Sequence, residues 1–139
     1  MMKSIPRIQH MEMYKASSEI VSAKSVNGEI NNIMNEIKIR FDDENAATQH
    51  LLKIDLICDV HTPDVDSDSP QGELKAIAEV AYEVSFDRYE EQYIDDIMAL
   101  VWPYLRSAAK RQLELINLGS TAEKLPFDLS LFIHEQNNQ

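Results

Sequence analysis

The sequence predicts an α+β fold: a four-stranded antiparallel sheet, then a long kinked helix and a short C-terminal helix. Apolar and polar residues first alternate with the period of a strand, and the apolar spacing later lengthens to that of a helix. The segments between the alternating stretches are short and polar, as expected between antiparallel neighbours. A run of strands followed by helix, without alternation of the two, favours α+β in a single domain spanning residues 1–139.

Four segments are predicted to form the strands. The clearest is Leu74–Asp87, where apolar side chains fall on one face and mainly polar ones on the other. The same alternation predicts strands over Leu51–His61 and Ile33–Asp42. A weaker strand is expected within Ile8–Ala16, and Ile20–Val26 is a candidate extension of it.

The last part of the chain is predicted to be helical. Apolar residues recur at helical spacing over Tyr93–Ile116, with acidic residues near the start and basic residues towards the end. Pro103 lies inside this pattern and predicts a kink or a break near Leu100. Gly119 stands where a C-terminal capping glycine is expected, and a second, short helix is predicted over 128–136.

The composition excludes several classes of protein. Thirteen Lys and Arg against 24 Asp and Glu give a net charge of −11, so we expect no nucleic-acid binding. The single cysteine, Cys58, leaves no intramolecular disulfide. The sequence shows no apolar run typical of a secretory signal or a membrane span, so we expect a cytoplasmic protein without membrane insertion.

No residue pattern predicts catalysis, a metal or a cofactor. An Asp-x-Asp-x-Asp run over 64–68 resembles the start of a calcium loop, but Ser69 replaces the required glycine and Lys75 the bidentate glutamate. Cys58 and His61 should lie on opposite faces of their strand, which excludes a shared metal. No nucleophile elbow or phosphate-binding glycine loop is present. We therefore expect a protein that is not an enzyme.

The predicted helix carries more apolar residues than one buried stripe needs. One helix cannot cover a whole face of a four-stranded sheet, so apolar surface should remain. We expect a homo-oligomer contact on the helix and a residual groove. The additional apolar residues of the helix are Leu100, Trp102, Tyr104, Leu115 and Leu118.

The stretch VWPYLRSAAKRQLELINLGSTAEKLPFDLSLF, Val101–Phe132, resembles the C-terminal signature of the SecB family of protein-export chaperones. The shared elements are an apolar pair before Pro103-Tyr104, Arg106, a long helix, Gly119, a Leu125-Pro126 step and a final amphipathic segment. Upstream, Ala78-Glu79-Val80 resembles the last strand of the family. The resemblance implies a four-stranded sheet with a long helix on one face, in subunits that assemble as a dimer of dimers.

The resemblance also implies a function and candidate sites. Family members bind unfolded polypeptides or preproteins in apolar grooves; some deliver them to the SecA motor, and others guard an antitoxin. Glu79 matches an acidic position implicated in motor contact. The groove candidates are Ile39, Phe41, Tyr82, Phe86, Leu129 and Phe132, and the oligomer-interface candidates are Val101, Trp102, Tyr104, Leu105 and Ala108.

Three functional hypotheses remain from the sequence. The first is a general or export chaperone that keeps clients unfolded. The second is a dedicated antitoxin- or phage-associated chaperone, because the chain ends soon after Phe132 and the other acidic motor-contact positions do not align cleanly. The third, from a different class, is an acidic interaction or inhibitor protein that mimics nucleic acid. Its binding should fall steeply with salt, whereas binding through apolar grooves should not.

Overall fold

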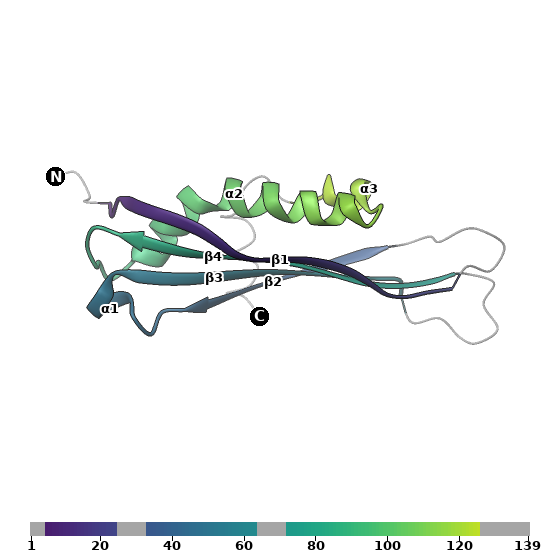
Figure 1. The fold of residues 1–139 in the computed structure, drawn as a ribbon, viewed down its shortest axis with the longest axis horizontal. Helices are drawn as coiled ribbons and strands as arrows, with labels where there is room; N and C mark the ends of the chain where they lie inside the picture. The colour runs from purple at the N-terminus through teal and green to yellow at the C-terminus, as the bar shows by residue number, and fades with distance from the viewer. Residues whose placement is uncertain (1–4, 25–32, 64–71, 126–139) are drawn as a thin grey trace.

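The computed structural model describes residues 5–24, 33–63 and 72–125 (Figure 1). Four strands form one sheet in the order β1-β4-β3-β2, and all neighbouring strands are antiparallel. The long helix α2 and the short helix α3 lie over one face of this sheet (Figure 1). The elements are β1 (Ile8–Lys24), β2 (Met34–Asp42), α1 (Ala46–Gln49), β3 (Leu51–His61), β4 (Glu73–Phe86), α2 (Tyr93–Leu115) and α3 (Gly119–Ala122).

The predicted fold class is confirmed, and the strand boundaries agree with the alternation. β3 has the predicted limits. β2 begins one residue later than predicted, and β4 begins and ends one residue earlier than predicted. β1 is longer than the predicted Ile8–Ala16, because it pairs with β4 along its whole length. The extension therefore depends on a long-range partner rather than on the weak local pattern of β1.

The core lies between the sheet and α2. On β3 and β4, the side chains of alternate residues point to the face that α2 covers, and nearly all of them are buried. The helix adds a stripe of buried apolar side chains to the same core. This arrangement is typical of an antiparallel sheet with one covered and one wet face. The fully buried side chains of β3 are Leu52, Ile54, Leu56, Cys58 and Val60.

A kink or a break was predicted near Leu100. α2 continues through Pro103, which lies on its exposed side, so the helix does not break there. The C-terminal capping residue is Asn117 rather than Gly119, because the helix already ends at Leu115. Asn117 has a φ of 64°, and its N–H donates to Glu114 O at 3.1 Å. The next N–H, that of Leu118, donates to Leu113 O at 2.8 Å, which completes a Schellman motif.

Gly119 instead begins α3. The predicted helix over 128–136 lies outside the described residues, so α3 is a different short helix from the predicted one.

Candidate functional site

The candidate site is a strip of three apolar side chains on β2, which we call the β2 strip: Ile37, Ile39 and Phe41. Their neighbours across the ladder on β3 are fully buried, so the strip faces the helix-covered side of the sheet. Those neighbours are Cys58, Leu56 and Ile54, in the same order. The strip therefore continues the core outward to the edge of the sheet.

The β2 strip is only partly covered. α2 packs mainly on β4 and β1 and less on β3, and β2 lies beyond these strands in the sheet. Ile37 and Ile39 are half-buried, and the side chain of Phe41 is 39% exposed. Tyr82 on β4 also points to this face and is half-buried. Among the described residues, the strip thus presents apolar surface that the subunit's own long helix does not bury.

Three further groove candidates are not placed in this strip. Phe86 is 1% exposed and belongs to the core, so its assignment to a groove was wrong. Its ring is stacked between those of His50 and Tyr93, at centroid distances of 5.7 and 5.3 Å. The alternation of β4 could not show this, because the stacking partners come from a turn and from the first residue of α2. Leu129 and Phe132 lie outside the described residues.

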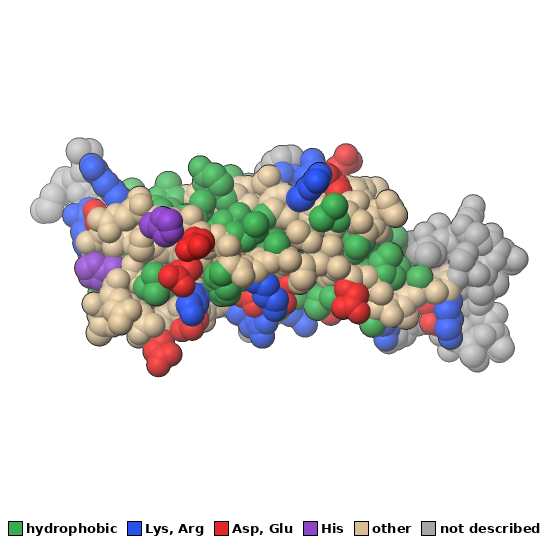
Figure 2. Space-filling view, viewed as in Figure 1, with side chains coloured by type: hydrophobic (Ala, Val, Ile, Leu, Met, Phe, Trp, Pro, Cys, Tyr) green, Lys and Arg blue, Asp and Glu red, His purple; other side chains and the backbone are tan. Residues whose placement is uncertain are grey.

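The predicted oligomer interface is divided between the core and the surface. Val101, Trp102 and Leu105 are at most 2% exposed within the subunit, so they are unavailable to a second copy in this conformation. Tyr104 is 56% exposed, and Ala108 is half-buried. Figure 2 shows apolar side chains along the middle of this face, while charged side chains lie along the side away from the helix and also over part of the helix layer. Of the five predicted interface residues, Tyr104 and Ala108 remain candidates for a contact between subunits.

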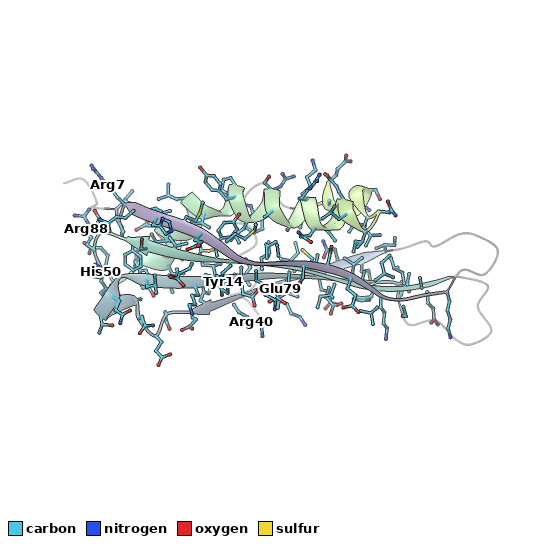
Figure 3. All side chains as sticks on the ribbon, in the orientation of Figure 1. Arg7, Tyr14, Arg40, His50, Glu79 and Arg88 are labelled. Atoms are coloured by element: carbon cyan, nitrogen blue, oxygen red, sulfur yellow. The ribbon has the colours of Figure 1, made fainter. Side chains whose placement is uncertain are left out.

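The other side of the sheet, which we call the outer face, carries a row of charges with one residue from each strand. Lys15 Nζ lies 3.0 Å from Glu79 Oε1, and Arg40 Nη2 donates to Asp55 Oδ2 at 2.9 Å. Glu79 and Asp55 meet in the middle of the row. Figure 3 shows Glu79, Arg40 and Tyr14 on this helix-free side. Glu79, the motor-contact candidate, is engaged within the subunit and its side chain is only 14% exposed.

The two carboxyl groups in this row have opposite pKa shifts. Burial, the hydrogen bond with Glu79 and the charge of Glu79 raise the pKa of Asp55 against the effect of Arg40. Burial also acts to raise the pKa of Glu79, but the hydrogen bond from Asp55 and the ion pair with Lys15 lower it overall. Asp55 Oδ1 is buried and has no hydrogen-bond partner among the described residues. The row is therefore a pair of interacting carboxyl groups that lies between two cations, Lys15 and Arg40.

A bulge in β1 shields part of the outer face. The register shifts between Met13 and Lys15, and the ring of Tyr14 lies 5.8 Å from Lys53 Nζ on β3. Lys53 is separated from β1 by β4, so the Tyr14 ring extends across that strand. Ala81 points to the outer face and is nevertheless 1% exposed, consistent with cover from this ring.

The described residues offer little that could bind a metal or span a membrane. No group of three or more His, Cys, Asp and Glu residues suited to a metal ion occurs among them. Cys58 points into the core, where burial raises the pKa of its thiol to about 11. His61 lies on the outer face, where it contacts Glu36 at 3.2 Å. No helix in the described part of the chain is long and apolar enough to cross a membrane.

Comparison with known proteins shows a similarity of structure. No protein-family model matches the chain, and no curated protein matches it. A solved structure of a SecB-like chaperone from Mycobacterium tuberculosis, in complex with a peptide from the HigA1 antitoxin, aligns with a TM-score of 0.45 and 13% sequence identity. The alignment covers 83% of this chain and 86% of that chain.

Proposed function

We propose that this chain is a subunit of a SecB-like chaperone that binds non-native polypeptide and catalyses no reaction. The observation that carries the proposal is the β2 strip, an apolar extension of the core that α2 leaves partly uncovered. Apolar surface of this kind marks a site for another apolar group. An unfolded client exposes such groups, so it can bind here without any chemical step.

The surface of α2 supports assembly into a homo-oligomer, which we propose to be a dimer of dimers. Tyr104 projects from the helix with Leu100 and Leu115, all three exposed in the single subunit. Burial of these side chains against a second copy would stabilise an assembly. Each copy adds one β2 strip, so a long client that touches several copies gains from effective concentration.

The outer face favours client holding over delivery to the SecA motor. Glu79 is paired with Lys15 and hydrogen-bonded to Asp55, so it is not a free acidic contact. We therefore propose that the primary activity is to hold clients in the unfolded state. Both general clients and dedicated ones, such as an antitoxin segment, should be tested.

Mimicry of nucleic acid has less support than either chaperone role. Basic residues from all four strands are interspersed with the acidic ones on the outer face, so it does not present an unbroken row of negative charge. These basic residues are Lys15, Lys24, Lys38, Arg40, Lys53 and Lys75.

The test is to mix the purified protein with an unfolded, slow-folding polypeptide. We expect a complex in size-exclusion chromatography and suppressed aggregation, both little changed by added salt. The double variant Ile39→Ser/Phe41→Ser should lose this activity, while Val21→Ser, which changes an exposed apolar residue on the other edge strand, should retain it. No complex with the unaltered protein, or complete loss of binding in salt, would contradict the proposal.

A further inference from the structure

The hydrogen bonds of the sheet determine which backbone groups of β2 point outward. Thr62 N donates to Leu74 O at 3.0 Å, and Phe86 N donates to His50 O at 3.0 Å. Both pairs continue the register of β3 with β4, so the even-numbered residues of β3 direct their backbone groups to β4. Because hydrogen-bonded and non-hydrogen-bonded pairs alternate in an antiparallel ladder, the odd-numbered residues of β3 bond to β2.

The partners of those odd-numbered residues are the even-numbered residues of β2. The odd-numbered residues of β2 therefore direct their N–H and C=O groups away from the sheet. These are the residues of the β2 strip, together with Asn35. The uncovered apolar side chains and the outward-pointing backbone groups thus belong to the same residues.

The two edges of the sheet differ in regularity. β1 has three register shifts, between Ile8 and His10, between Met13 and Lys15, and after Ile20. Such bulges bend and twist a strand, and they are a common protection of sheet edges. β2 pairs with β3 over all nine of its residues without a shift. Of the two edge strands, β2 is therefore the one that can pair with a further strand in regular register.

The outer-face side chains of β2 indicate which sequence such a strand would carry. Glu36 contacts His61 at 3.2 Å, and Arg40 is bound to Asp55. Lys38, between the two apolar positions 37 and 39, is exposed and has no ion-pair partner within the described part of the chain. In an added antiparallel strand, the residue opposite Lys38 would lie on the same face, with its Cβ about 4.5–5.5 Å away. An acidic residue suits this position.

We propose that the edge of β2 binds an extended polypeptide segment by antiparallel strand addition, and that the favoured segment alternates apolar residues with an acidic residue opposite Lys38. The inference rests on the proposed function, and it specifies how the client is held. The client's apolar residues would lie beside the β2 strip and direct their own N–H and C=O groups to β2.

The test uses synthetic peptides that alternate isoleucine with serine, carry one central glutamate in place of a serine, and have charged ends for solubility. One version is N-methylated at two isoleucines and another at two serines. Methylation at the isoleucines should weaken binding at least about tenfold, because it removes the donors to β2 and adds methyl groups at the edge. Methylation at the serines should leave the affinity within about twofold, because those N–H groups point away.

Lys38→Glu tests the charge preference. Against the peptide with central glutamate, its affinity should fall about two- to fivefold, and against a central-lysine peptide it should rise by a similar factor. The control is Lys24→Glu on β1, which changes the net charge by the same amount as Lys38→Glu. It should change the affinity for either peptide only by the small effect of net charge.

Equal binding of both methylated peptides, or the reverse pattern, would overturn antiparallel strand addition while leaving the proposed function in place. If no peptide and no unfolded polypeptide binds, the proposed function itself fails. A second copy could also pair along β2. A mass that doubles with concentration, no longer doubles in the variant Ile39→Pro and is unaffected by the peptide would assign the edge to self-association and overturn the proposal.

Discussion

Replacing Phe41 by alanine should weaken client binding while leaving the fold intact. Phe41 is 39% exposed. A phenylalanine side chain buries roughly 150–250 Å², so about 60–100 Å² of it remains for a client to cover. At about 25 cal/mol per Å², covering that area contributes at most about 1.5–2.5 kcal/mol. Ordering of the client reduces this gain, so we expect a loss in affinity of about five- to tenfold.

The measurement is a titration of a labelled unfolded polypeptide, followed by fluorescence anisotropy at fixed ionic strength. Thermal unfolding of the variant must match that of the unaltered protein, because part of Phe41 contacts the sheet. Val21→Ala provides the control: Val21 is 59% exposed but lies at a bulge in β1. An unchanged affinity in a normally folded Phe41→Ala variant would refute the assignment of the β2 strip as the client site.

Three further predictions concern the core and the outer face. Trp102→Ala should lower the free energy of unfolding by about 3–5 kcal/mol, whereas Tyr104→Ala should change it by less than about 0.5 kcal/mol, measured by urea denaturation. Equal changes in the free energy of unfolding for the two variants would indicate that Trp102 lies in a subunit interface rather than in the core. Because the folded-state pKa of Asp55 is raised, its stabilising effect is present at low pH and is lost as the pH rises through that pKa. Asp55→Asn, which resembles the protonated acid, should therefore gain stability over the unaltered protein as the pH rises from about 4 to about 7, by no more than about 1 kcal/mol. Cys58 should resist a thiol reagent in the folded protein and react once urea unfolds it, because the thiol is buried and its pKa is raised to about 11; fast reaction without denaturant would show that the core opens locally.

The sequence was sufficient to predict the sheet but not the allocation of apolar residues between core and surface. Alternation identified β3 and β4, because each has one buried and one wet face. It could not show that Trp102 faces the subunit's own sheet, since a helix with apolar residues on two sides has two possible buried stripes. Which stripe the sheet covers depends on how α2 crosses β4 and β1, and no local pattern encodes that crossing.

The groove candidates show the same limit. Ile39 and Phe86 both continue an alternating apolar pattern, so the sequence treats them alike. The structure separates them because Phe86 lies beneath the start of α2 and stacks on Tyr93, whereas Ile39 lies on a strand that the helix does not cover. Exposure of an apolar strand residue is thus decided by the position of its strand in the sheet.

The difference between the two edges follows from pairing rather than from composition. β1 and β2 both carry apolar side chains on the helix-covered side, and both have one unpaired edge. The bulges of β1 move Tyr14 onto the outer face and interrupt its regular pattern of outward backbone groups. The register of β2 with β3 has no shift along the whole strand. Every residue of β2 that directs its N–H and C=O groups outward therefore has its side chain on the helix-covered side. A client strand added there would gain backbone hydrogen bonds and apolar contacts in the same register, and a slip of one residue would lose the apolar contacts. This coupling is why N-methylation, which leaves the side chains unchanged, distinguishes strand addition from adhesion to an apolar surface.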